Sequence, residues 1–318
     1  MERIVQYNTL GKTGLRVSDV GFGAWAIGGM DWGSRAQDED AVAALNVSLE
    51  RGVNFFDTCD AYGDGHSEEL IGECFRGRRH DVIIATKGGT NFRIPERSRN
   101  FNPDYIMMCV DESLRRLQTD YIDLYLLHVP VLEWQQKTDI YATLKAVKQS
   151  GKARHVGLAM WRAADTVHAL EHDTDGVIEA LECPFNILNK TNVEVIRMAS
   201  ERGIGVFTSE PLAAGILTGK YSASSQFAAG DHRAKFWTPE RFASLEPDMD
   251  VIRSCVREPV ENMTQLALAY ILNVPGISCV IPGCKNARQA LDNISASGLR
   301  LNKDIMRILR STNGFIYQ

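Results

Sequence analysis

Four polar residues with complementary chemistry lie just beyond apolar, strand-like runs. Asp57, Lys87 and His128 each directly follow such a run, and Tyr62 lies five residues after Asp57. In a parallel β/α barrel the carboxyl ends of the strands meet on one face, so residues far apart in sequence can share a pocket. The set combines a phenol, a cation that favours its ionisation, a carboxylate to hold the cation, and an imidazole.

Each of these residues also has an ordinary structural explanation. Asp57 and Tyr62 could cap and pack a strand–helix loop, Lys87 could be a solvated loop lysine, and His128 a hydrogen-bonded core histidine. A lysine directly after a buried strand must find an anion or water, however, because isolated buried charge is costly. The joint pattern therefore indicates one site more strongly than any single member does.

The elements that would position these residues alternate between strand-like and helix-like segments. Eight β/α units are expected, the number that closes a (β/α)8 TIM barrel. The predicted strands are 20–23, 53–56, 82–86, 122–127, 155–158, 177–181, 205–208 and 277–281. The predicted helices are 39–51, 67–75, 103–117, 137–149, 163–172, 193–202, 260–272 and 287–294, leaving a long segment, 220–259, with few periodic apolar residues.

Two local patterns add detail to this expectation. Residues 4–7 and 14–18 alternate in polarity across a glycine-containing turn, which predicts an N-terminal β-hairpin that plugs the barrel bottom. Asn102 is expected to be the N-cap of the helix that begins at Pro103.

Composition and charge narrow the class of protein. The 318 residues contain no linker-like stretch, so one barrel domain over 1–318 is expected. The formal net charge of -5 argues against a nucleic-acid partner. We see neither a signal peptide nor an apolar run approaching ~18 residues, so no membrane association is expected and a cytoplasmic protein is predicted. The seven cysteines form no CxxC pair and indicate reduced thiols. The sequence does not decide whether the chain forms a homo-oligomer.

At several motifs, in the same order, the chain resembles the aldo-keto reductase family. The resemblance implies a (β/α)8 barrel, NADPH as cofactor, and a catalytic tetrad of Asp57, Tyr62, Lys87 and His128. The stretches that carry it are 7–18, 21–25, 57–62, 65–72, 120–128, 211–221 and 281–283.

The resemblance also implies a mechanism. Tyr62 would protonate the carbonyl oxygen of an aldehyde, ketone or keto-sugar as hydride arrives from the nicotinamide, and His128 would orient that carbonyl. Lys87, fixed by Asp57, is expected to lower the pKa of the phenol by about 3 units, which corresponds to about 4 kcal/mol.

The expected nicotinamide pocket departs from the family pattern. Ala159 and Met160 stand where the family usually has a serine and a further polar residue, and Glu182 stands where it often has a glutamine. Ser209 replaces the aromatic residue that commonly stacks on the ring. These changes predict a loosely held nicotinamide, an unusual substrate, or a barrel that binds cofactor and turns over slowly.

Recognition of the adenosine phosphate is closer to the family pattern. A helix that begins near Asn286 would attract anions, and Lys285 and Arg288 would favour NADPH over NADH; a solvated basic helix start is the alternative. The resemblance assigns the remaining cofactor contacts to Trp25, Pro211, Leu212, Gly219, Lys220, Gly283, Gln289 and Asn293.

Substrate selection is expected in loops at the strand ends, where residues 230–237 could form a lid. The candidate pocket walls, for which core packing is the competing explanation, are Trp25, Asp31, Trp32, Phe92, Trp161, Phe236 and Trp237. The alternative functions are a cofactor-sensing binding protein, since barrels of this family also serve as channel subunits, and a metal-dependent hydrolase. The histidines lack the ligand spacing that a metal site needs, so no metal is expected.

Overall fold

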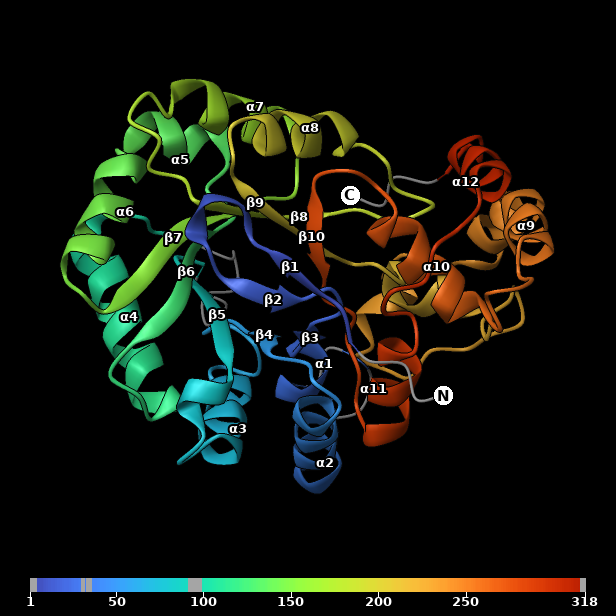
Figure 1. Ribbon diagram of the computed structural model, residues 1–318, viewed down its shortest axis with the longest axis horizontal. Coiled ribbons are helices and arrows are strands. Elements are labelled where there is room, and N and C mark those ends of the chain that lie inside the picture. The colour runs from blue at the N-terminus through green and yellow to red at the C-terminus, as the bar shows by residue number, and fades with distance from the viewer. Residues whose placement is uncertain (1–4, 30–31, 33–35, 91–98, 315–318) are drawn as a thin grey trace.

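Eight parallel strands form one curled sheet in the computed structural model, which describes residues 5–29, 32, 36–90 and 99–314 (Figure 1). Neighbours follow the chain order from β3 to β10, and parallel bridges from Val20 to Val280 and from Gly23 to Gly283 join the two edges. The result is the predicted (β/α)8 barrel. Its strands are β3 Phe22–Gly23, β4 Phe55–Asp57, β5 Ile83–Gly88, β6 Ile122–His128, β7 Ala153–Ala159, β8 Ala180–Pro184, β9 Gly205–Ser209 and β10 Ile277–Val280.

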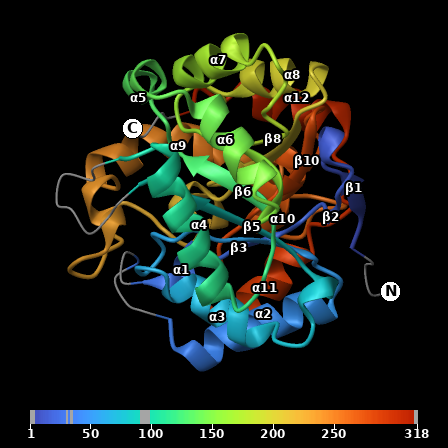
Figure 2. The same cartoon turned by 90° about the vertical axis from the view of Figure 1, so that its left-hand side faces the viewer.

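Helices surround the strands, as Figure 2 shows from the side. The α-helices are α1 Trp25–Gly28, α2 Asp38–Glu50, α3 His66–Cys74, α4 Pro103–Leu117, α5 Leu132–Lys137, α6 Ile140–Gln149, α7 Ala163–His172, α8 Val193–Glu201, α9 Pro239–Ser254, α10 Met263–Leu272, α11 Ala287–Ile294 and α12 Lys303–Arg310. Short 3-10 segments are η1 Gly11–Thr13, η2 Arg79–Asp81, η3 Ala213–Thr218 and η4 His232–Lys235. None of the helices in the described ranges is long and apolar enough to cross a membrane.

Two apolar clusters separate the inside of the barrel from the layer under the helices. The large cluster fills the space between strands and helices, whereas a small one, which includes Phe55, Leu126 and Phe207, fills the barrel interior. Side chains alternate between the two faces of a strand with a period of two. A residue two positions beyond an inward apolar residue therefore also points inward, as Asp57 and His128 do after Phe55 and Leu126.

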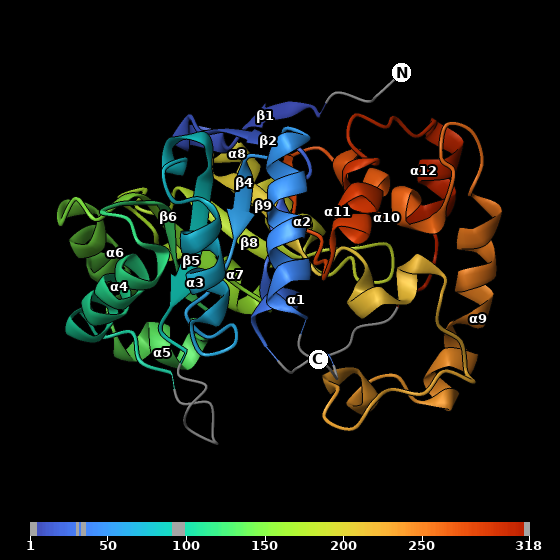
Figure 3. The ribbon, with the colours of Figure 1, turned by 90° about the horizontal axis from the view of Figure 1, so that it is seen from below.

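The predicted N-terminal hairpin is present and covers one end of the barrel. Strands β1 Tyr7–Thr9 and β2 Arg16–Ser18 pair antiparallel, and Leu10 between them is fully buried in the interior cluster. Gly11 approaches β9 so closely that a Cβ atom there would lie 2.2 Å from the Gly205 nitrogen. Figure 3 shows the hairpin at one end of the barrel and the η4 segment at the opposite end.

Several predicted boundaries differ from the structure. Strand β8 was expected at 177–181 but occupies Ala180–Pro184, because the Asp173 carboxylate accepts the backbone N–H groups of Val177 and Ile178, at 2.7 and 2.9 Å. Asn102 occupies the N-cap position of α4, but its side chain makes no capping hydrogen bond.

Helix α9 lies within the segment 220–259, where no element was predicted. Its buried apolar residues, Phe242, Leu245, Met249 and Ile252, follow a helical spacing. The sequence argues against a helix here, because Pro247 lies inside it and an internal proline removes one backbone hydrogen bond. Helices α1, α5 and α12 were not predicted either.

Candidate active site

A buried ion pair stands at the C-terminal end of β4 and β5. Lys87 Nζ donates to Asp57 Oδ1 at 2.6 Å and Oδ2 at 2.8 Å, and also to the Thr58 carbonyl oxygen at 2.9 Å. The Lys87 side chain is fully buried. Burial alone would lower the pKa of Lys87, but Asp57 and Glu182 hold it well above its ordinary value. Lys87 is therefore a permanent cation at this end of the barrel.

A second carboxylate contacts the same lysine. Glu182 Oε2 lies 3.2 Å from Lys87 Nζ, and the Glu182 side chain is 8% exposed. Burial raises the pKa of Asp57 to about 8, because the lowering by Lys87 does not offset burial and Glu182 raises the pKa further. The sequence pattern placed Glu182 near the nicotinamide but did not predict this contact. Its inward position, two residues after Ala180, was the available signal.

Tyr62 lies in the loop after β4, beside the lysine. Lys87 Nζ is 5.2 Å from the centroid of the Tyr62 ring, which stacks at 6.1 Å on the ring of Trp25. Burial raises the pKa of the Tyr62 phenol well above its ordinary value, and Lys87 opposes this only in part while Asp57 and Glu182 add to it. The expected lowering of this pKa is therefore wrong: the second carboxylate and burial outweigh the cation. The phenol holds its proton at neutral pH.

His128 ends β6 and points into the same region. Its Nδ1 lies 3.3 Å from the Sγ atom of Cys59, and its carbonyl oxygen accepts a hydrogen bond from the Thr90 hydroxyl at 2.7 Å. Burial raises the pKa of the Cys59 thiol well above its ordinary value, so Cys59 remains a thiol. The ring of Trp161, which is 45% exposed, lies 6.3 Å from the His128 ring and forms a rim. Cys59 was not among the predicted site residues.

The residues predicted to hold the nicotinamide divide into two groups. Ala159 and Ser209 end strands β7 and β9, Glu182 lies within β8 between them, and Ala159 belongs to the interior cluster. Met160 is 1% exposed and packs in the outer cluster between strands and helices, so the structure does not bring its side chain to the site. Its position one residue after Ala159 already indicates the outward face. Pro211 is buried, and Leu212 packs against the outer cluster.

The residues predicted to hold a phosphate lie around the start of α11. Asn286 caps this helix by accepting from the Gln289 N–H at 3.0 Å, and Gln289 Oε1 in turn accepts from the Lys285 N–H at 2.9 Å. Gln289 is thus engaged in the cap. Arg288 is exposed, and the buried Asn293 donates to the carbonyl oxygen of Gly283 at 3.4 Å.

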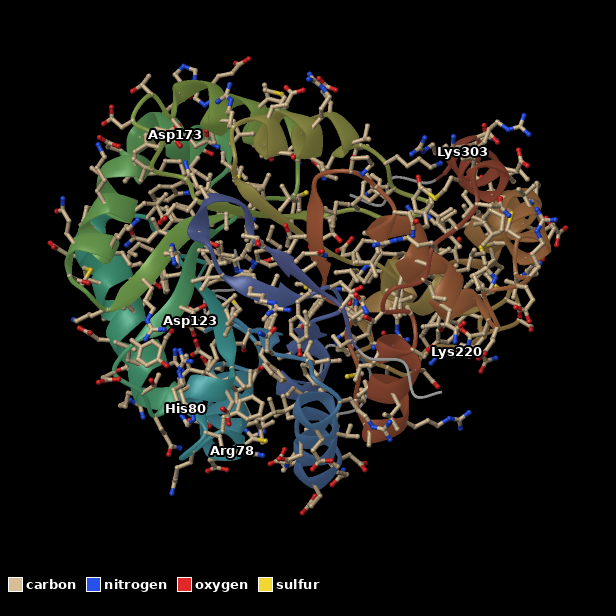
Figure 4. The ribbon with its side chains drawn as sticks, viewed as in Figure 1. Arg78, His80, Asp123, Asp173, Lys220 and Lys303 are labelled. Carbon is tan, nitrogen blue, oxygen red and sulfur yellow. The ribbon has the colours of Figure 1, made fainter. Side chains whose placement is uncertain are left out.

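Lys285 also belongs to a group of neighbouring cations. Its Nζ donates to the Trp32 carbonyl oxygen at 3.2 Å. Its pKa is lowered by burial first and then by the positive charges of Arg233 and Lys220, against the opposing charge of Asp231. Lys220 follows Gly219, which ends η3 in the left-handed conformation. In Figure 4 the labelled Lys220 lies in the half of the molecule that contains α10 and α11, far from Asp123.

Residues from the expected lid contact the aromatic residues beside Tyr62. The His232 ring lies 5.0 Å from that of Trp25 and 4.4 Å from that of Trp32. Arg233 pairs with Asp231 and donates to the Tyr221 hydroxyl at 2.6 Å. These contacts place η4 against the site.

The remaining candidate pocket walls have different outcomes. Trp237 is 4% exposed and packs on Phe242 in the outer cluster, so Trp237 is a core residue and not a pocket wall. Phe236 packs against the same cluster. Asp31 and Phe92 lie outside the described residues.

The site thus consists of a lysine–carboxylate pair, a tyrosine and a histidine at the C-terminal face of a (β/α)8 barrel. The sequence profile of the Aldo/keto reductase family matches residues 19–313. The chain is 29% identical to "Aldo-keto reductase YhdN" of Bacillus subtilis (strain 168), covering 97% of this chain and 95% of that protein. It is 30% identical to "Probable voltage-gated potassium channel subunit beta" of Oryza sativa subsp. japonica, covering 92% of this chain and 91% of that one.

Among solved structures, the holo form of aldo-keto reductase AKR11C1 from Bacillus halodurans superposes with a TM-score of 0.81 at 25% identity, covering 99% of this chain and 98% of that one. The chain belongs to the aldo/keto reductase family. The resemblance seen in its motifs is thereby confirmed.

Proposed function

We propose that the protein is an NADPH-dependent oxidoreductase that reduces the carbonyl of an aldehyde, ketone or keto-sugar, with Tyr62 as the general acid. The observation that carries this proposal is the buried Lys87–Asp57 pair, whose ammonium lies 5.2 Å from the centroid of the Tyr62 ring. A protonated phenol next to a fixed cation can give up its proton to a carbonyl oxygen because the cation stabilises the phenolate that forms.

The described side chains suit NADPH at both ends of the expected cofactor site. Lys220, Arg233 and Lys285 gather positive charge near the start of α11, which suits a phosphate group. At the other end, Glu182 Oε2 is buried and has no hydrogen-bond partner among the described residues, so it can accept from a carboxamide N–H. NADPH, when bound, would supply the hydride.

The chain's own residues would handle the proton and the carbonyl. Tyr62 holds the proton that the carbonyl oxygen receives, and Lys87 then faces the phenolate. His128 would donate to the same oxygen and orient the carbonyl. Trp25, stacked on Tyr62, and Trp161, beside His128, would confine the substrate to the space between these two groups.

The test is the Tyr62→Phe variant, assayed with NADPH against a panel of carbonyl compounds. We expect reduction to be abolished while NADPH binding, measured by calorimetry, stays almost intact. Tyr7→Phe is the matched control, because Tyr7 is an exposed tyrosine on the hairpin at the other end of the barrel. Substantial turnover by Tyr62→Phe would remove Tyr62 from the role of acid.

The second candidate is a cofactor-sensing binding protein with slow turnover. It is favoured by the similarity to a protein named as a channel subunit and by the second carboxylate on Lys87. Tight NADPH binding without turnover of any carbonyl in the panel would support this candidate over the reductase.

A further inference from the structure

The charge balance around Lys87 is the least expected feature of the site. Asp57 on β4 and Glu182 on β8 both contact Lys87 on β5. In the sheet order, β8 is separated from β5 by β6 and β7, so Glu182 reaches the lysine across the barrel interior. Two carboxyl groups therefore share one ammonium in a buried space, where a single carboxylate would balance its charge.

We propose that Glu182 is a second counter-ion of Lys87 that withholds the positive charge of the lysine from the Tyr62 phenol. It is a positioning residue, because its charge acts on the ionisation of the phenol, both directly and by offsetting Lys87, and it is not itself the proton donor. Its consequence for catalysis rests on the proposed function of Tyr62, whereas its effect on the ionisation of the phenol does not. In this arrangement the proton stays on Tyr62 until a reaction partner takes it.

The contacts of Glu182 support this role. The side chain is 8% exposed, and its Oε2 lies 3.2 Å from Lys87 Nζ without a hydrogen bond among the described residues. Removing a carboxylate from water without hydrogen bonds is costly, so its buried position depends on the nearby cation. If this position were needed only for packing, an apolar side chain of similar volume would fill it at a lower cost in free energy.

The other charged or titratable groups around the phenol do not duplicate Glu182. Asp57 accepts hydrogen bonds from Lys87 with both oxygens, and the Thr58 carbonyl accepts a third, so these two residues anchor the ammonium. Cys59, from the same loop as Tyr62, remains a thiol, and His128 from β6 faces that thiol. Asp60 is half-buried, and removal of its carboxyl group from water raises its pKa to about 7.

The electrostatic direction follows from the signs of the charges. A cation favours ionisation of a phenol and an anion disfavours it. The negative charge of Glu182 therefore raises the pKa of Tyr62 and offsets part of the lowering by Lys87. Removing only the charge of Glu182 should strengthen the influence of Lys87.

The experiment is an ultraviolet titration of phenolate absorbance in the protein without cofactor or substrate, with the Tyr62→Phe protein as background. In Glu182→Gln, which keeps the shape of the side chain, we expect at least about tenfold more Tyr62 phenolate at a given pH, equivalent to ~1.4 kcal/mol. Glu182→Asp, which keeps the charge, should restore the parent titration in large part. Glu179→Gln is the matched control, because Glu179 precedes β8 and pairs with His155 at the start of β7.

An unchanged or raised phenol pKa in Glu182→Gln would overturn the inference. If that variant does not fold, the parent titration decides, since a Tyr62 phenol that ionises at or below its ordinary value of about 10 contradicts the role of Glu182. The outcome is separable from the proposed function. A lowered phenol pKa together with full turnover by Tyr62→Phe would keep the counter-ion role and discard the general acid.

Discussion

The Sγ atom of Cys59 lies 3.3 Å from Nδ1 of His128, and both side chains are buried. The thiol also has two competing acceptors, Asp60 Oδ1 at 3.3 Å and the Lys87 carbonyl oxygen at 3.6 Å. If the thiol donates to Nδ1, the neutral imidazole carries its proton on Nε2. That tautomer can donate to a carbonyl oxygen, so a residue outside the tetrad would set the hydrogen-bonding role of His128.

Replacing Cys59 tests this relationship. Cys59→Val has a similar volume but no donor, so we expect kcat to fall by up to about tenfold, since ~1.4 kcal/mol is the upper end of what one neutral hydrogen bond contributes. Cys59→Ser keeps a donor and should retain most of the activity. Nitrogen NMR of His128 provides the readout of the tautomer, which should change only in Cys59→Val. Equal activity and equal spectra for the two variants would contradict the role of Cys59.

A second prediction concerns stability at the other end of the barrel. Burial alone would raise the pKa of Glu179, but hydrogen bonds from His155, Lys148 and the Val156 N–H lower it to about 2. A folded-state pKa below the unfolded one adds stability that is present above the unfolded value of about 4.5. This contribution is lost as the pH falls from about 5 towards 2.

Glu179→Gln should therefore lower the free energy of unfolding at neutral pH by ~1–2 kcal/mol after allowance for solvent screening. The difference from the parent should shrink as the pH falls through that window. Urea unfolding at several pH values measures both. Glu133→Gln is the control, because Glu133 is exposed and pairs with Lys137 on the helix surface. A difference for Glu179→Gln that stays constant with pH would contradict the linkage.

The tetrad positions could be predicted from sequence because strand ends are local signals. Asp57, Lys87 and His128 each follow an apolar run, and the period of two directs them to the barrel interior. The same period of two places Ala159 inside the barrel and Met160 outside it. The family resemblance had assigned both residues to the nicotinamide. The pairing of Glu182 with Lys87 could not be read in this way, because it depends on the distance across the closed barrel. The direction of the Tyr62 pKa was wrong because burial, together with the two carboxylates, outweighs the cation Lys87.

Cofactor choice gives a third prediction, which rests on the proposed phosphate site. Replacing Lys285 and Arg288 together by Ala should weaken NADPH binding by one to two orders of magnitude, because each charge-assisted contact typically contributes ~1.5–3 kcal/mol and both residues are partly solvated. NADH binding should change far less. Calorimetry with both cofactors measures the two effects. Lys303→Ala, on the exposed start of α12, is the control. Equal losses for NADPH and NADH would place these two residues outside the 2'-phosphate site.

The last prediction concerns the nicotinamide end, where Ser209 is half-buried at the end of β9 and offers no ring for stacking. Affinity should then come mostly from the adenosine-phosphate end, so a 2'-phosphorylated adenosine fragment should retain most of the binding free energy of NADPH. Ser209→Tyr adds a ring, and an aromatic stack contributes about 0.5–1.5 kcal/mol beyond burial. We expect this variant to bind NADPH several-fold more tightly and the fragment with unchanged affinity.

Calorimetry of both ligands with both proteins provides the comparison, and Ser209→Thr controls for added bulk. Weak binding of the fragment to the parent, or an equal change for both ligands in Ser209→Tyr, would mean that another residue already holds the ring, with Trp161 beside His128 as the first candidate.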